Sequence, residues 1–190
     1  MPNRQPIVLA SASPRRLELL RNAGIEFIVR PADIAEVPLA NESPTAFAER
    51  MAREKALVAR ESSSEQVILA ADTVVAVDDQ ILGKPQDAED AVRMLRMLSG
   101  KNHSVITGVC LAGSNFEDVR SETTAVHFSL LNEDEIRDYV RTGEPMDKAG
   151  AYAIQGKASR WITKIEGDYY NVVGLPVDLV CRTLREHELL

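Results

Sequence analysis

Two adjacent arginines, Arg15 and Arg16, stand where the sequence predicts the start of a helix. The residues before them support this start, because Ser13 suits the N-cap and Pro14 suits the first helical position. The first turn of a helix has free N–H groups and the positive end of the helix dipole, so arginines are unfavourable there unless they bind an anion. Guanidinium and backbone N–H groups both suit phosphate oxygens. The stretch therefore indicates either a phosphate site or two solvated arginines, and it favours neither.

A single acid, Asp72, interrupts the apolar run of residues 67–77. Such a run is typical of a buried strand, and a buried carboxylate is costly unless a cation or hydrogen-bond donors face it. An unpaired structural aspartate is thus the weaker interpretation. The position favours a role in metal binding or in proton transfer.

Two lysines occupy positions that a phosphate site would explain. Lys55 falls on the apolar stripe of a helix predicted from Ser43 to about Arg60, and Lys84 is held between a glycine and a proline. An ammonium group that points into a cleft could bind an anion. Alternatively, Lys55 could extend to the rim of the core and Lys84 could be an exposed lysine at a sheet edge.

The segment from Asp147 to Gly156 is rich in small residues, so its backbone can approach a ligand or another strand closely. A tight structural turn would have the same composition. If a ligand is present, Gln155 is the polar side chain best placed to face it.

Composition limits the classes of function. The chain has 190 residues and a net charge of −7, with a pI of about 5.1. An acidic chain is a poor match for a nucleic-acid groove, although a small polyanion needs only a local cluster of lysine and arginine. The two cysteines are far apart and no apolar run approaches a membrane span, so we expect a cytoplasmic protein with no membrane partner. No P-loop, dinucleotide-binding, zinc-protease or G-x-S-x-G motif occurs.

The order of predicted elements indicates an α/β protein. Strands are expected at 7–9, 26–30, 67–77, 81–85, 103–112 and 119–130, separated by helices that begin at Ser13, Ser43, Asp87 and Asn132, with a last helix after 171–176. The strands at 103–112 and 119–130 should form an antiparallel pair inside a mixed sheet. We find no linker or repeat, and so treat residues 1–190 as one domain.

Six motifs together closely resemble the Maf family of nucleoside triphosphate pyrophosphatases. They are LASASPRR at 9–16, AREKA at 52–56, AADTVV at 70–75, GKP at 83–85, DKAGAYAIQG at 147–156 and NVVGLP at 171–176. The match spans nearly the whole chain in the order of the family.

The resemblance implies an elongated mixed sheet flanked by helices, similar to inosine triphosphatases, with two lobes and a central cleft in a homodimer. It implies hydrolysis between the α and β phosphates with Mg²⁺ or Mn²⁺. Asp72 would be the general base and a metal ligand, and Glu36 would help to bind the metal. The phosphates would be held by Ser13, Arg15, Arg16, Lys55 and Lys84. Related chains often have another acid before the residue equivalent to Glu36, where this chain has Ala35.

Three positions resemble the family branch that acts on dTTP and UTP. A sister branch acts on 7-methyl-GTP and tends to carry Trp, Gln and Glu at the places held here by Arg15, Thr73 and Gln155. The amide of Gln155 offers one donor and one acceptor, which match the N3–H and carbonyl of uracil or thymine. The alternatives are 7-methyl-GTP hydrolysis and a nucleotide-sensing regulator of septum formation. A sensor would have no need of a base at Asp72.

Overall fold

The computed structural model describes residues 6–63 and 66–190, and seven strands in this part of the chain form one mixed sheet. Along its main path the strands run β2, β1, β3, β5, β6, β7, and β4 pairs with β3. β1 is parallel to both β2 and β3, and the other pairings are antiparallel. The strands are β1 (Ile7–Leu9), β2 (Phe27–Val29), β3 (Ile68–Val77), β4 (Gln80–Leu82), β5 (Asn102–Ala112), β6 (Glu117–Phe128) and β7 (Ile162–Glu166).

The described helices begin close to where the sequence places them. They are α1 (Pro14–Asn22), α2 (Pro44–Glu61), α3 (Ala88–Leu98), α4 (Glu133–Arg141), α5 (Tyr169–Val173) and α6 (Val177–Glu186), with three short 3-10 turns η1 (Glu144–Asp147), η2 (Ala149–Ala151) and η3 (Lys157–Trp161). None of the helices in the described part is long and apolar enough to cross a membrane.

Side-chain caps explain most of these starts. The Ser43 hydroxyl accepts from Ala46 N–H, and Asn132 forms a reciprocal capping box with Glu135. Ser13 does occupy the N-cap of α1 with extended backbone, but its side chain makes no capping hydrogen bond. The hydroxyl of Ser13 is therefore not used by its own helix.

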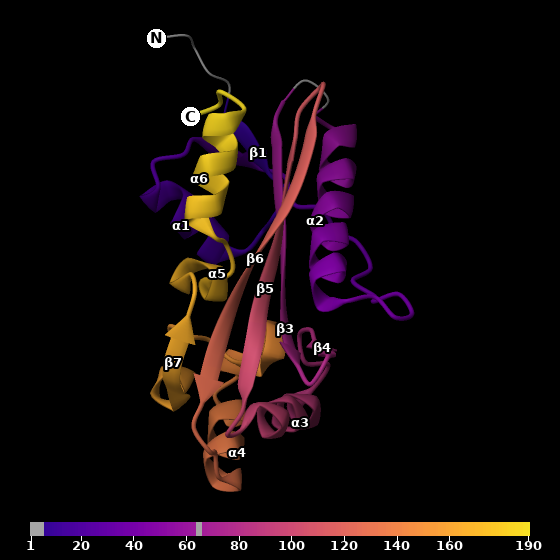
Figure 1. Cartoon of the computed structure of the whole chain (residues 1–190). Coiled ribbons are helices and arrows are strands. Elements are labelled where there is room, and N and C mark those ends of the chain that lie inside the picture. Colours follow the sequence, from indigo (N-terminus) through magenta and orange to yellow (C-terminus); the bar gives the residue numbers. More distant parts are fainter. Residues whose placement is uncertain (1–5, 64–65) are drawn as a thin grey trace.

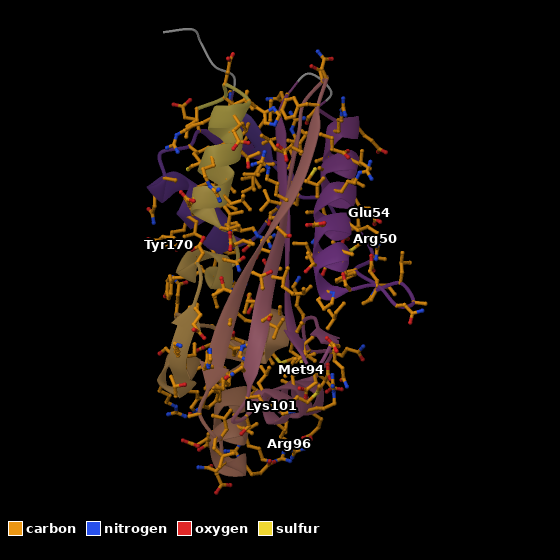
Figure 2. All side chains as sticks on the ribbon, viewed as in Figure 1. Arg50, Glu54, Met94, Arg96, Lys101 and Tyr170 are labelled. Carbon is orange, nitrogen blue, oxygen red and sulfur yellow. The ribbon has the colours of Figure 1, made fainter. Side chains whose placement is uncertain are left out.

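Three long strands run the length of the molecule, with helices on both faces (Figure 1). The inner face of α2 packs on β3 and β5 through buried residues that include Phe47, Ala48 and Met51. Its outer face is charged, as Figure 2 shows for Arg50 and Glu54, which form an ion pair at 2.9 Å. α1, α5 and α6 cover the opposite face toward one end, while α3 and α4 close the other end (Figure 1). The predicted α/β fold is thus confirmed.

The edge of β3 opposite β5 is only partly paired. β1 pairs with it at Ile68 and Leu69, and β4 pairs with it again from Val75 to Val77. Neither strand pairs with residues 70–74, so the sheet has an opening with Asp72 at its centre. This opening determines where the site lies.

Candidate active site

A cleft of about 890 Å³ lies at the open edge of β3. Segments from both ends of the molecule contribute its walls, and every site residue predicted from the sequence lines it. These residues are Ser13, Arg15, Arg16, Glu36, Lys55, Asp72, Thr73, Lys84 and Gln155. The folded chain therefore brings together six sequence segments that are far apart along the chain.

Asp72 is buried and its charge is met by Lys55. The Lys55 ammonium donates to Asp72 Oδ1 and to Glu36 Oε1, both at 2.6 Å. Only 10% of the Lys55 side chain and 6% of the Asp72 side chain are exposed. A buried pair of this kind costs desolvation but leaves neither charge unpaired. The anions that Lys55 meets in the structure are thus two carboxylates of its own chain.

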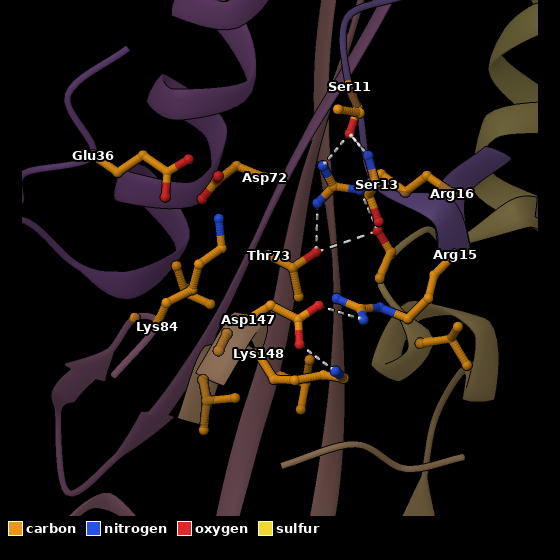
Figure 3. Close-up of a pocket in the computed structure, with 18 of the residues that line it drawn as sticks. Ser11, Ser13, Arg15, Arg16, Glu36, Asp72, Thr73, Lys84, Asp147 and Lys148 are labelled. Carbon is orange, nitrogen blue, oxygen red and sulfur yellow. Dashed lines mark hydrogen bonds and ion pairs between the residues drawn. The ribbon is translucent and has the colours of Figure 1, made fainter. Parts of the chain in front are cut away.

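Glu36 lies beside the cations of the cleft. Burial acts to raise the pKa of its carboxyl, but the hydrogen bond from Lys55 and the charges of Lys55, Lys84 and Arg16 outweigh burial and lower the pKa below its usual value. Lys84 is exposed and points toward Glu36 and Asp72 (Figure 3). Glu36 therefore remains ionised as the pH falls to values at which an ordinary glutamate would be protonated.

Arg15 bonds across the cleft to a residue that sequence reasoning did not select. Its Nη1 donates to Asp147 Oδ2 at 3.2 Å, and Asp147 also pairs with Lys148 (Figure 3). Asp147 and Lys148 both line the cleft. The sequence signal for them was two adjacent opposite charges at the start of the small-residue segment, a pattern that also occurs on ordinary surfaces.

Arg16 is bound to the protein itself. Its guanidinium donates to the Gly174 and Ala71 carbonyls, each at 2.8 Å, and to Thr73 Oγ1 at 3.0 Å. It also donates to Ser11 Oγ at 3.2 Å. Burial lowers the pKa of this guanidinium from its usual value, and the charges of nearby acids oppose that shift. Ser11 is a further cleft residue that sequence reasoning missed, because a hydroxyl among small residues gives no distinctive pattern.

The other two proposed specificity residues differ in exposure. Thr73 is half-buried, and its hydroxyl lies 2.9 Å from Thr107 Oγ1 and 3.3 Å from the Gly174 carbonyl. Gln155 is exposed at the cleft wall. Gln155 is consequently the one of the two whose polar group can reach a bound ligand without breaking a buried contact.

The carboxylates of Glu36 and Asp72 suit a divalent cation. Mg²⁺ commonly takes one or two protein carboxylates and completes its shell with water and substrate phosphates. Among the described residues no group of three or more His, Cys, Asp or Glu side chains gathers at one place. The donor set thus matches an ion held jointly by two acids and a polyphosphate, and it is too small for a metal cage made by the protein alone.

Comparison with solved structures finds a protein of similar fold. The chain resembles the Staphylococcus aureus Ham1 protein, with a TM-score of 0.56 and 14% sequence identity over 96% of this chain and all of that one. At this identity the likeness concerns the fold alone: an α/β protein with a long mixed sheet.

Sequence comparison identifies the family. Residues 6–187 match the model of the Maf-like proteins, and the chain belongs to this family. A relative from Koribacter versatilis, named dTTP/UTP pyrophosphatase, is 53% identical over 97% of this chain and 95% of its own. A second relative of the same name, from Geobacter metallireducens, is 50% identical over 97% of each chain. The family predicted from the six motifs is confirmed.

Proposed function

We propose that this protein is a nucleoside triphosphate pyrophosphatase that hydrolyses dTTP and UTP to the nucleoside monophosphate and pyrophosphate. The observation that carries this proposal is the cleft, in which Asp72, the cationic side chains of Arg15, Lys55 and Lys84, and the amide of Gln155 line one cavity. Relatives about half identical over nearly the whole chain are named dTTP/UTP pyrophosphatases, which supports this substrate class.

The reaction needs a water molecule in line with the scissile bond, a base beside it and cations around the phosphates. Asp72 is the candidate base, because it faces the cleft from the open edge of β3. Arg15 and Lys84 are placed to hold phosphate oxygens. Mg²⁺ or Mn²⁺ held by Glu36 and Asp72 would polarise the phosphoryl group and lower the pKa of a bound water.

Lys55 links substrate binding to the base. In the ligand-free protein its ammonium donates to Asp72 Oδ1 at 2.6 Å and so occupies one oxygen of the proposed base. A triphosphate offers Lys55 a stronger anion, so binding draws the ammonium toward the phosphates. Asp72 Oδ1 would then be free to accept from the attacking water.

Gln155 is the candidate residue for recognising the nucleobase. Its amide donates to a carbonyl and accepts from N3–H, an arrangement that uracil and thymine satisfy and cytosine does not. The extra methyl of thymine is worth only about 1–3 kcal/mol in a pocket, so dTTP and UTP should both be substrates.

The test is a panel of nucleoside triphosphates, including 7-methyl-GTP, with the products identified in the presence of Mg²⁺ or Mn²⁺. UTP and dTTP should give the monophosphate and pyrophosphate faster than CTP and the purine triphosphates. A chelator should abolish turnover, and either ion should restore it. Release of orthophosphate with a diphosphate left behind would contradict the reaction, and a preference for 7-methyl-GTP would contradict the branch.

We also propose that the protein is a cytoplasmic homodimer. The family resemblance supports the dimer, and the scattered cysteines support a reducing compartment. Light scattering on the eluting protein should give twice the chain mass of 20.9 kDa. A monomer at micromolar concentration would contradict the dimer without affecting the reaction.

A further inference from the structure

The guanidinium of Arg16 has little capacity left for a ligand. Arginine carries five N–H groups, and four of them bond to Ser11, Ala71, Thr73 and Gly174. A phosphate held by arginine is usually bound through two parallel N–H groups. Arg16 could offer two only by releasing a partner. The adjacent Arg15, with one exposed ion pair, has no such restriction.

The partners of Arg16 belong to three separate segments of the chain. Ser11 precedes α1, and Gly174 links α5 to α6. Ala71 and Thr73 flank Asp72 on β3. The Leu69 carbonyl accepts from the N–H of Ala10, the residue after β1, and the next carbonyl on that edge, at Ala71, accepts from Arg16. Arg16 thus lies at the sheet opening and bonds to the residues on both sides of the proposed base, to the backbone of Ala71 and to the side chain of Thr73.

Gly174, which accepts from Arg16, lies next to residues that pack near Gln155. Val172, Val173 and Gly174 line the cleft. Val173 and Ile154 belong to one buried cluster, and Ile154 precedes Gln155 in the chain. The bonds from Arg16 and Thr73 to Gly174 therefore join β3 to a segment that shares a buried cluster with the residue before Gln155.

We propose that Arg16 is a positioning residue, which braces the cleft wall of Val172–Gly174 and the Gln155 segment against β3, and that it is not a phosphate ligand. The nucleobase part of this inference rests on the proposed function. Thr73 bonds to both Arg16 and Gly174, so it influences substrate choice by helping to hold this wall in place.

The main test compares Arg16→Lys with Arg15→Lys, since both keep the charge and change one of two neighbouring arginines. Lysine has three donors on one nitrogen and cannot span the four partners of Arg16. Without nucleotide, Arg16→Lys should lower the Tm by at least about 5 °C, because buried acceptors lose their donors. Arg15→Lys should change it by only about 1 °C, because its ion pair is partly exposed.

Binding of inorganic tripolyphosphate, measured by calorimetry, separates the two roles. Arg16→Lys should leave the Kd within about threefold of the wild type, whereas Arg15→Lys should raise it about tenfold, the cost of a lost charge-assisted contact. In turnover assays, Arg16→Lys should reduce the ratio of kcat/KM for UTP over CTP at least about tenfold, because Gln155 loses its placement. A tenfold weaker tripolyphosphate Kd in Arg16→Lys, or an unchanged Tm, would overturn the proposal.

A second pair keeps the test valid if Arg16→Lys does not fold. Thr73→Val preserves the shape of the side chain and removes the hydroxyl that Arg16 and Gly174 contact, and Thr73→Ser restores the hydroxyl. Thr73→Val should lose discrimination between UTP and CTP with tripolyphosphate binding retained, and Thr73→Ser should recover most of that loss. An equal ratio of kcat/KM for UTP over CTP in Thr73→Val and Thr73→Ser would overturn the proposal. If the wild type hydrolyses neither nucleotide, the proposed function fails, while the Tm and tripolyphosphate measurements still decide the role of Arg16.

Discussion

Asp72 and Lys55 depend on each other in the ligand-free cleft. Each is almost fully buried, and each neutralises the other. The sequence indicated that a buried Asp72 needs a cation or hydrogen-bond donors, and that Lys55 needs an anion if it points into a cleft. It could not indicate that the two were partners, because 17 positions separate them and only the packing of α2 on β3 brings them together.

Asp72→Asn should lower kcat by at least about 100-fold, the usual contribution of a general base, because an amide cannot accept the proton. The protein should remain folded, since Lys55 keeps its bond to Glu36. Asp79→Asn is the matched control, because Asp79 is an exposed acid just after the same strand. Rates with saturating UTP and thermal unfolding would measure both effects. Near-normal turnover in Asp72→Asn would assign the base elsewhere.

Gln155→Glu tests whether Gln155 recognises the nucleobase. A carboxylate only accepts hydrogen bonds and would repel the pyrimidine carbonyl, so kcat/KM for UTP should fall by at least about 100-fold. The Tm should hardly change, because the side chain is exposed. A parallel measurement with CTP shows whether the loss is specific to the base. Equal losses of kcat/KM for UTP and CTP would mean that Gln155 does not recognise the nucleobase.

At the scale of elements, local signals predicted where segments begin, and long-range contacts determined how they meet. Ser43, Asp87 and Asn132 cap their helices as the sequence predicts. These signals are local, because a cap bonds to an N–H group within one turn. The gap between β1 and β4 on β3 has no local signal, since it depends on the register of three separate strands. The bond from Arg16 to Gly174 spans 158 positions for the same reason.

The placement of Lys55 depends on how closely α2 approaches the sheet. A Cβ atom at Gly108 on β5 would lie 2.2 Å from the Ala48 carbonyl oxygen of α2, so only glycine allows this distance. Gly108→Ala should push α2 outward and cost about 1–3 kcal/mol of unfolding free energy, the range for overpacking. It should also reduce turnover, because Lys55 moves with the helix.

Gly83→Ala is the matched control for this prediction. A Cβ atom at Gly83 meets nothing within 4 Å, and its backbone is outside the left-handed region. The unfolding free energy should change by less than about 1 kcal/mol, measured by urea denaturation. Equal destabilisation by the two changes would mean that the close approach of α2 is not what makes Gly108 necessary.

At the scale of the whole molecule, the long strands connect two packed ends. One buried cluster gathers β1, α1 and α6, and another gathers α3, α4 and the aromatic residues around Trp161. The cleft is lined by residues of both clusters, Ile154 and Val173 from the first and Val75 and Tyr152 from the second, so its walls belong to different parts of the core. Loss of stability at one end should therefore affect the site through the wall that this end supports.

His103 makes the stability of the second cluster depend on pH. It is 3% exposed, its Nε2 lies 2.8 Å from Tyr152 Oη, and the ring packs edge-on against Phe128. Burial, with a smaller contribution from His127, lowers the pKa of His103 to about 4. The unfolded chain binds a proton at His103 near its usual pKa of about 6.5, so it takes up this proton at a higher pH than the folded chain does. The contribution to stability is complete above pH 6.5 and is lost as the pH falls toward 4.

The unfolding free energy of the wild type should accordingly decrease by up to about 3 kcal/mol more than that of His103→Gln between neutral pH and pH 4. Glutamine can still bond to Tyr152 but does not titrate, so the variant isolates this one group from the carboxylates that protonate in the same range. Tyr152→Phe is the matched control: it removes the hydroxyl and leaves His103 buried, and it should retain the slope of the wild type. Urea denaturation at intervals of pH would give the three curves. Parallel curves for the wild type and His103→Gln would mean that His103 has the same proton affinity in the folded and unfolded chains, and that burial does not control its charge.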